Sequence, residues 1–573
     1  MLTSSKSFFF FLKETYESNR TIIIVSLVLS FLQVVTASVG IVLILPLIEL
    51  LDNAAEPEQL HWITQNVLWV FNTLNIPVDT LNILIVFSAL VGVAFFIRFL
   101  HSRVVAKLQN DVVTQEREAL YSLAKNSYWI ALHNLLPSKL THALVYIVNA
   151  SGRAITLTNS FLNLTLLIVF GIAASSMLSL ELMGVIILFV LVSGAAILPI
   201  YKRSKDMGKS QLHAMEALHG TFSEHFANSR LLKSEKFDGY FERQASHEVE
   251  ELKDKSLRLQ HQTALTQLLL GLVVIISLVA FTYISLDVLS ISFAETVVAI
   301  IILARLLPLV SGIQQSGQQL MHLLPQIAEL NNIKMYLRKN LEVKHNDTEE
   351  WHVEKGVSVQ HVGLQSFSGA WLCRNVNFNI QPYGVNLLFG VSGTGKSSCA
   401  DALAGLREVN EGKISIGSTV LSSNNIHHWR SHVHYLSQEV NLLSTSLRNN
   451  LCLGHQFSDS QLLEALASVG LSSWMTRYNV SLDSSISALG RNVSGGQAQR
   501  IQMARALLQQ PKLLILDEVT AHLDKQSARD IASLVAEISK NMTVLVISHD
   551  TLWHDYANHQ HELISESESN SND

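Results

Sequence analysis

The first 312 residues contain six apolar stretches, and these constrain the fold more than any other feature. They cover roughly residues 21–48, 81–100, 155–180, 182–201, 262–286 and 288–312. About 20 helical residues span the hydrocarbon core of a bilayer, and a helix satisfies its own backbone hydrogen bonds there. Only 15% of the chain is charged, whereas a soluble protein carries about 25%. The stretches therefore predict six membrane-spanning helices, and a large soluble helical bundle is the weaker alternative.

The charges between these stretches predict an orientation. The long connections 101–154 and 202–261 are rich in Lys and Arg, whereas the other three connections carry acidic residues only. By the positive-inside rule, the N-terminus, both basic connections and everything after the sixth helix should be cytosolic. Helices two to five are expected to extend into the cytosol and to reverse near 126–136 and 221–232.

After about residue 335 the long apolar stretches end, and a polar segment is followed by alternating strand-like and helical stretches. We expect a transmembrane domain over 1–335, a polar linker over 336–350, an α/β domain over 351–564 and a disordered acidic tail over 565–573. The net charge of −6, without a basic stripe, argues against nucleic acid as a partner. The three cysteines lack CxxC spacing, which fits a reducing compartment.

A glycine-rich loop in the α/β domain predicts a nucleotide site. The sequence GVSGTGKS at Gly390–Ser397 follows an apolar strand (Val385–Phe389) and precedes a helix (Ser398–Leu406). Backbone N–H groups of such a loop surround phosphates, Lys396 should reach the β- and γ-phosphates, and Ser397 should ligate Mg²⁺. The predicted phosphate-binding residues are Gly390, Ser392, Gly393, Thr394, Gly395, Lys396, Ser397 and Ser398.

A second motif predicts hydrolysis. Leu513–Glu518 has the pattern of a buried strand that delivers two carboxylates at its end, beside the phosphate loop. We expect Asp517 to hold Mg²⁺, and Glu518 to polarise the attacking water. A surface acid at a strand end is the alternative for Glu518.

The segment Val493–Gln497, followed by Ala498-Gln499-Arg500, resembles the signature of ABC (ATP-binding cassette) ATPases, with Val493 where Leu is usual. The order of motifs is also similar: phosphate loop, Gln438, signature, Asp517, His549. Six apolar helices before one such ATPase resemble an exporter-type ABC half-transporter. The resemblance therefore covers the whole chain.

This resemblance implies roles for further residues. Gln438 corresponds to the Q-loop that contacts Mg²⁺, and His549 to the switch histidine that contacts the γ-phosphate. Asp524 lies where the family's D-loop falls, although Ala521 replaces the usual Ser. In this family the signature residues act on ATP held by the other ATPase domain; here they are Ser494, Gly495, Gly496 and Gln497. This implies a dimer, and we expect a homodimer, with a heterodimer as the alternative.

Three further expectations concern single sites. The residue that aligns with the adenine-stacking aromatic is Ser366, so Phe367 or Trp371 is expected to stack instead. Glu295 and Arg305 lie about 15 Å apart along the sixth helix and are candidates to line a substrate cavity. The reversals near Trp129 and at 223–230 correspond to the family's coupling helices.

Together these features predict an ATP-hydrolysing exporter that works by alternating access. Its substrate would be an amphipathic small molecule, a peptide or a lipid. A lipid flippase, a siderophore-type importer on the same fold, and an ATP-gated channel or regulator are the alternatives. Membrane lipid is an expected partner, ATP and Mg²⁺ are the expected cofactors, and the inner membrane of a bacterium is the expected location.

Overall fold

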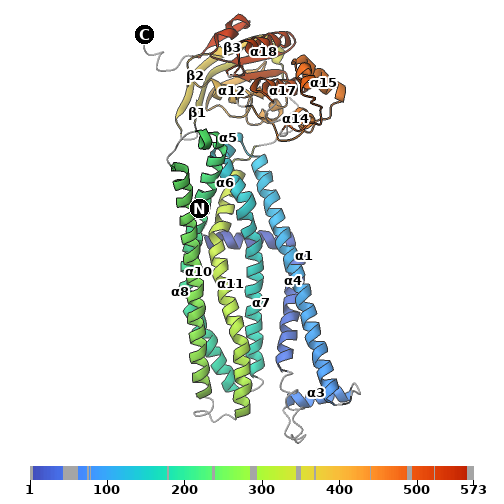
Figure 1. The fold of residues 1–573 in the computed structure, drawn as a ribbon, viewed down its shortest axis with the longest axis vertical. Helices are drawn as coiled ribbons and strands as arrows, with labels where there is room; N and C mark the ends of the chain where they lie inside the picture. Colours follow the sequence, from blue (N-terminus) through green and yellow to red (C-terminus); the bar gives the residue numbers. More distant parts are fainter. Residues whose placement is uncertain are drawn as a thin grey trace. The chain divides into compact units, whose positions relative to one another are not determined.

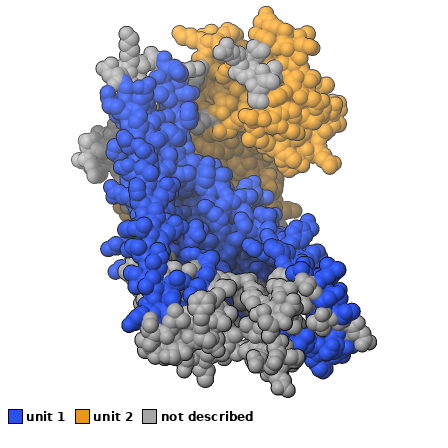
Figure 2. Space-filling model, turned by 60° about the horizontal axis from the view of Figure 1, so that its bottom comes forward, with its two compact units in different colours: residues 1–125, 135–339 blue, residues 126–134, 340–573 orange. Residues whose placement is uncertain are grey.

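The computed structural model describes residues 4–42, 62–73, 77, 79–176, 180–234, 239–283, 293–342, 350–366, 369–438, 440–486, 493–521 and 523–563. The chain divides into two compact units, which Figure 2 colours separately. The first comprises residues 1–125 and 135–339, and the second residues 126–134 and 340–573. Residues 343–349 of the predicted linker and the whole predicted tail lie outside the described ranges, and residues 336–339 form the end of a helix. The domain boundaries stay predictions.

The first unit is helical throughout its described residues (Figure 1). Its six long helices are α1 (Ser4–Val42), α4 (Thr80–Lys125), α7 (Val148–Ser176), α8 (Leu180–Ala227), α10 (Tyr240–Tyr283) and α11 (Phe293–Lys339). Shorter pieces are α3 (Trp62–Thr73), α6 (Pro137–His142), α9 (Ser229–Ser234) and a π-helical turn at Ala143–Ile147. Each of the six predicted apolar stretches lies mostly or wholly within one long helix, and the fold-class prediction is confirmed.

Membrane-spanning character is visible in the exposed surface of these helices. Four helical segments within the described residues are long and apolar enough to cross a bilayer: Lys6–Thr36, Leu84–Lys125, Pro137–Ala173 and Tyr240–Tyr283. On α10, Leu268, Ile275, Ile276 and Val279 are 60–68% exposed, which suits contact with lipid. The stretch 182–201 lies in α8, and the described part of the last stretch, 293–312, lies in α11. Most side chains of these two segments fall outside the description.

An ion-pair cluster joins three helices of this unit. The ammonium of Lys334 in α11 is buried and lies 3.0 Å from a Glu116 carboxylate oxygen and 3.4 Å from one of Glu14. A buried ammonium needs such partners, because desolvating an unpaired charge costs several kcal/mol. α1, α4 and α11 are thereby held together beyond their apolar contacts.

The second unit is an α/β domain with two sheets. An antiparallel sheet has the order β2-β1-β4-β5, formed by β2 (Trp371–Ile380), β1 (Val357–Gln365), β4 (Glu411–Ile416) and β5 (Thr419–Val420). A parallel sheet has the order β6-β7-β8-β3-β9, formed by β6 (Val433–Leu436), β7 (Leu513–Asp517), β8 (Thr543–Ile547), β3 (Gly384–Phe389) and β9 (His559–Glu562). The helices are α5 (Trp129–Asn134), α12 (Lys396–Leu403), α13 (Ile426–Arg430), α14 (Leu447–Cys452), α15 (Asp459–Ser468), α16 (Ser472–Arg477), α17 (Gly495–Leu508) and α18 (Lys525–Ile538).

The central strands β7 and β8 are buried on both faces, as expected of a parallel sheet covered by helices. Successive residues point to opposite faces, so Leu514 and Leu516 enter one hydrophobic core while Leu513 and Ile515 enter the other. The sheet is fixed between these two cores. Its strand ends are therefore rigid supports for the loops that follow them.

Residues 126–134 belong to the second unit although they lie between α4 and α6 in sequence. The Tyr128 N–H donates to the Asn340 carbonyl at 3.0 Å, and the Glu342 N–H donates to the Asn126 carbonyl at 2.9 Å. The Tyr128 hydroxyl also donates to a Glu408 carboxylate oxygen at 2.9 Å. The first predicted reversal is thus anchored on the α/β domain.

Candidate functional site

Four predicted motifs meet at one edge of the parallel sheet. The strands β6, β7, β8 and β3 are neighbours and run parallel, so their carboxyl ends lie at the same edge. Gln438 follows β6, Glu518 follows β7, His549 follows β8, and the glycine-rich loop follows β3. The fold therefore assembles these motifs, and only the strand order could bring them together.

The phosphate loop is closed by its own lysine. The Lys396 ammonium donates to the carbonyls of Gly390 and Val391, both at 2.9 Å. Gly393 and Gly395 have φ of +87° and +89°, in the left-handed region that favours glycine. Gly395 caps α12 without a side-chain hydrogen bond, so the first N–H groups of that helix have no side-chain acceptor there. Such a helix start favours an anion.

Burial lowers the pKa of the Lys396 ammonium, while the charges of Glu518 and Asp517 act in the opposite direction. The two carboxylates are thus close enough to influence the lysine. A bound phosphate would add favourable negative charge at the same place.

Asp517 has the features of a cation ligand. It is buried at the end of β7, and its Oδ2 accepts a hydrogen bond from the Tyr435 hydroxyl at 3.0 Å. Its Oδ1 is buried and has no hydrogen-bond partner in the described part of the chain. Burial raises the pKa of Asp517, and the hydrogen bond from Tyr435 and the nearby Ser397 hydroxyl oppose this. A buried oxygen with an open lone pair, next to the Ser397 hydroxyl, fits Mg²⁺ or a water bound to it.

Glu518 and His549 face each other across the strand ends. His549 Nδ1 lies 3.1 Å from Glu518 Oε1, and the two side chains are 66% and 23% exposed. Glu518 has a φ of +50°, an uncommon conformation for a residue with a side chain. Its N–H donates to the Ile547 carbonyl at 2.9 Å, which holds the strained residue in place. The carboxylate is therefore fixed at the sheet edge and open to water.

The signature residues lie at the start of α17. Ser494 Oγ accepts from the Gln497 N–H at 3.3 Å, and Gln497 Oε1 accepts from the Ser494 N–H at 2.8 Å, forming a capping box. Gly495 is exposed, and a Cβ on Gly496 would lie 3.3 Å from Leu523. Asp524 caps α18, and hydrogen bonds from backbone N–H groups lower the pKa of its carboxyl. Between described residues, no hydrogen bond links these residues to the phosphate loop.

The structure describes one of the two aromatic residues that are expected to stack on adenine. Phe367 lies outside the described residues. Trp371 is 37% exposed, and the Arg374 guanidinium lies 4.7 Å from its ring centre. A Cβ on Gly395 would lie 2.9 Å from the Leu372 carbonyl, so the residue after Trp371 already contacts the phosphate loop.

Tyr435 is a site residue that the sequence motifs did not reveal. It belongs to no motif, yet β6 pairs with β7 and its hydroxyl reaches Asp517. The available signal was only a polar ring three residues before Gln438. The Glu295 and Arg305 side chains lie outside the described residues, so their predicted cavity role is not tested.

Residues 373–521 match the sequence model of a family described as "ABC transporter". These residues therefore form an ABC domain, which binds ATP. The long apolar helices of the N-terminal unit indicate a membrane protein. The match includes the phosphate loop, Gln438, the signature and both acidic residues of β7 and its end.

Curated relatives are similar to this chain over part of their length. A multidrug resistance ABC transporter ATP-binding and permease protein of Lactococcus lactis subsp. lactis is 25% identical over 61% of this chain and 60% of its own. A protein of the same name from subsp. cremoris is 32% identical over 34% of this chain and 33% of its own. The ATP-dependent lipid A-core flippase of Escherichia coli K12 is 36% identical over 31% of each chain. The matches thus cover between about a third and three-fifths of these relatives.

Proposed function

We propose that this chain is one subunit of an ATP-driven exporter that moves an amphipathic compound across a membrane. The observation that carries the proposal is the assembly of Lys396, the open oxygen of Asp517 and the Glu518–His549 pair at one sheet edge. A regulator that only binds ATP, without hydrolysing it, would not need the Glu518–His549 pair. The helical unit, with its exposed apolar surface, supplies the membrane path.

In this proposal Glu518 accepts a proton from the water that attacks the γ-phosphate, and His549 orients Glu518 and contacts the phosphate. Lys396 leaves the carbonyls of Gly390 and Val391 to bind the phosphates. Mg²⁺ would be held by Ser397 and Asp517, together with Gln438 from the neighbouring strand end. The ion would neutralise negative charge on the phosphates. Trp371 is the better supported adenine platform, because its neighbour contacts the phosphate loop.

We propose a homodimer as the working unit. Ser494, Gly495 and Gly496 have no hydrogen bond to the phosphate loop between described residues, and Gly495 is exposed. They are therefore available to ATP bound by a second copy. Because this one chain carries both the phosphate loop and the signature, two copies suffice for two sites. A heterodimer with a degenerate partner is the alternative.

The orientation and location are proposed from charge. The basic connections 101–154 and 202–261 favour the cytosol, which places both termini there. The named relatives are a multidrug resistance ABC transporter protein and a lipid A-core flippase of bacteria, and on that basis we propose the bacterial inner membrane. Residues 1–335 would form the transmembrane domain and residues 351–564 the ATPase domain.

The test is ATP hydrolysis by the purified full chain in lipid nanodiscs. We expect basal hydrolysis that Glu518→Gln lowers by about 10²-fold or more, because the general base is lost while ATP binding is kept. The control is ATP binding by the variant, measured with a fluorescent ATP analogue. Equal hydrolysis by Glu518→Gln and wild type would exclude the assigned base, and no hydrolysis by wild type would exclude the homodimer.

A further inference from the structure

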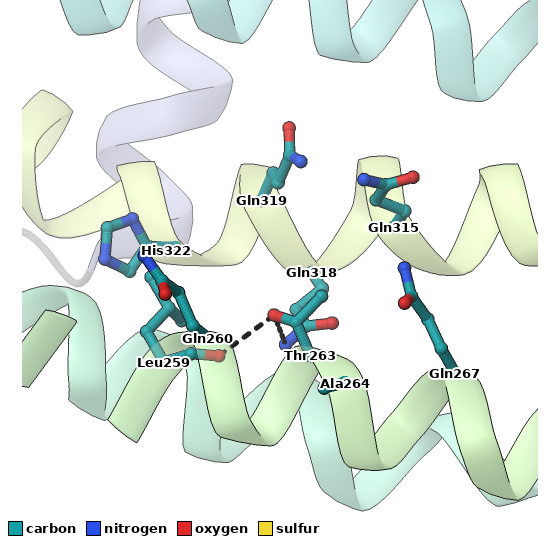
Figure 3. Close-up of a pocket in the computed structure, with 9 residues that line it drawn as sticks. All are labelled: Leu259, Gln260, Thr263, Ala264, Gln267, Gln315, Gln318, Gln319 and His322. Atoms are coloured by element: carbon teal, nitrogen blue, oxygen red, sulfur yellow. Dashed lines mark hydrogen bonds between the residues drawn. The ribbon is translucent and has the colours of Figure 1, made fainter. Parts of the chain in front are cut away.

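A pocket with an amide-rich lining lies between α10 and α11, within the first unit (Figure 3). It encloses a volume of about 290 Å³. Its lining residues are Leu259, Gln260, Thr263, Ala264 and Gln267 from α10, and Gln315, Gln318, Gln319 and His322 from α11. On both helices the polar members follow helical spacing, so each helix presents one continuous face to the pocket. We call it the glutamine pocket.

The glutamine pocket is uncharged. Its nine lining residues include no Asp, Glu, Lys or Arg. The only titratable side chain among them is His322, whose ring nitrogen lies 2.7 Å from the Gln211 side-chain oxygen. Burial lowers the pKa of His322, with a smaller contribution from the Arg153 charge, and both effects favour the neutral ring. No charged side chain therefore lines the pocket.

Part of the lining is fixed, and part is free to bind. Gln318 is buried, donates to the Thr263 hydroxyl at 3.2 Å and accepts from Gln314 at 2.9 Å. The dashed lines of Figure 3 show this connection between the two helices, together with the bond from Thr263 to the Leu259 carbonyl. These hydrogen bonds position the pocket wall and do not involve the side-chain amides of the other four glutamines that line it.

Four outer glutamines are exposed, and within the described residues their side chains have no hydrogen-bond partner. They are Gln260, Gln267, Gln315 and Gln319. Each carboxamide offers an N–H donor pair and a carbonyl acceptor, so the set can serve a ligand that both donates and accepts. Figure 3 shows Gln267 extending from α10 toward the turn of α11 that carries Gln315.

The place of the pocket along the helices suits a transported ligand. Gln315–His322 directly follow the predicted span 288–312, and Leu259–Gln267 overlap the start of the span 262–286. The pocket is thus at one end of the apolar part of the unit. An amphipathic ligand can place its polar part among the amides and its apolar part along the exposed leucines of α10.

We propose that the glutamine pocket binds the uncharged polar part of the transported substrate, a group that both donates and accepts hydrogen bonds, such as peptide amides or sugar hydroxyls. This inference rests on the proposed transport function. A phosphorylated headgroup is disfavoured, because no Arg or Lys lines the pocket to balance its charge and an unpaired charge in a partly buried site is unfavourable.

The test measures ATPase stimulation of the full chain in nanodiscs with three probes. They are an N-acetylated, C-amidated apolar peptide, a neutral glycosyl diacylglycerol, and phosphatidic acid. We expect the peptide or the glycolipid to stimulate hydrolysis, and which of them does so identifies the source of the polar group. Phosphatidic acid should give no stimulation.

The double variant Gln267→Leu/Gln315→Leu removes two free amides without adding charge. We expect the half-maximal concentration of the neutral probe to rise about 10-fold or more, each variant's stimulated rate being read relative to its own basal rate. His261→Leu is the matched control, since His261 is exposed on α10 and does not line the pocket. A second variant, Gln267→Glu/Gln315→Glu, keeps the side-chain size and should also weaken the neutral probe.

Two results would overturn the proposal: stimulation by phosphatidic acid alone, or an unchanged half-maximal concentration in both double variants. Basal hydrolysis separates this failure from failure of the proposed function. If wild type hydrolyses ATP and the variants respond normally, only the pocket assignment is wrong. If wild type does not hydrolyse ATP, equilibrium binding of the labelled peptide to wild type and to the Leu variant still decides whether the pocket binds it.

Discussion

The two oxygens of Asp517 have different environments. Oδ2 is held by the Tyr435 hydroxyl, and Oδ1 is buried without a partner among the described residues. One bond thus orients the carboxylate and leaves the other oxygen for a cation. Hydrogen bonding from Tyr435 also favours the ionised form, against the burial that raises the pKa of Asp517.

Tyr435→Phe should therefore weaken the response to Mg²⁺ without abolishing hydrolysis. A hydrogen bond to a charged group contributes about 1.5–3 kcal/mol, so we expect the Mg²⁺ concentration for half-maximal hydrolysis to rise about 10-fold. A Mg²⁺ titration of ATPase activity in nanodiscs measures this. Tyr478→Phe, an exposed tyrosine outside the site, is the control, and equal titration curves for wild type and Tyr435→Phe would contradict the role.

At the scale of elements, the same local motif occurs twice with different surroundings. α17 begins with a capping box of Ser494 and Gln497, and α15 begins with one of Ser458 and Gln461. In both, the Ser hydroxyl accepts a hydrogen bond from the third backbone N–H of the helix. The Gln side-chain oxygen in turn accepts one from the Ser backbone N–H. Only the first box belongs to the signature, so a comparison separates capping from a role in ATP hydrolysis.

Ser494→Ala and Ser458→Ala should each lower stability by about 1 kcal/mol, since each loses one cap. Only Ser494→Ala should also lower ATP hydrolysis, by about 10-fold, because its hydroxyl is proposed to contact ATP on a second copy. Thermal unfolding and steady-state ATPase assays of both variants provide the comparison. An equal loss of hydrolysis in the two variants would mean that capping alone accounts for the effect.

The short helix α5 is a second element with a testable role. The Tyr128 hydroxyl, just before it, donates to Glu408 of the α/β domain, and burial together with this bond raises the pKa of Tyr128 to about 12. The segment is thus attached to the ATPase domain by a side chain as well as by the backbone bonds to Asn340 and Glu342.

Tyr128→Phe should leave basal hydrolysis close to wild type and reduce its stimulation by substrate at least twofold. The reason is that an exposed hydrogen bond contributes about 1 kcal/mol, enough to loosen the segment without unfolding the domain. The measurement is the ratio of stimulated to basal ATPase rate with the neutral probe. Retention of the full ratio would show that this bond does not contribute to coupling.

At the scale of the whole molecule, the proposed homodimer makes a prediction about mixed subunits. Lys396→Ala should disable the phosphate loop of its own chain, and Ser494→Arg the signature that serves the other chain. Each variant alone should be inactive. In a dimer of the two, one site combines both defects and the other combines neither.

Co-expression of the two variants should therefore restore roughly a quarter of wild-type hydrolysis, since about half of random dimers are mixed and one of their two sites is intact. Two different affinity tags allow the mixed dimer to be isolated and its ATPase rate measured. An inactive mixture with normal tag association would contradict sites shared between two copies. Absence of association would contradict the homodimer itself.

The sequence alone determined the six helices, the α/β domain and the order of the nucleotide motifs. These depend on patterns within short segments: about 20 apolar residues for a span, and a strand, a glycine-rich turn and a helix for the phosphate loop. The long extensions of α4 and α8 were also expected from the helical pattern of the connections, with reversals near 126–136 and 221–232, and the two helices end at Lys125 and Ala227. For these elements the sequence pattern and the tertiary structure agree, because the residues that make the pattern are the ones that form the element.

Other features were decided by tertiary structure. The contact of Tyr435 with Asp517 depends on the pairing of β6 with β7, whose residues are about eighty positions apart. The glutamine pocket depends on α10 lying against α11, and the attachment of residues 126–134 depends on Glu408 and Asn340. Each is a contact between distant segments, which strand order and helix packing select. A single sequence carries no local pattern that specifies such neighbours.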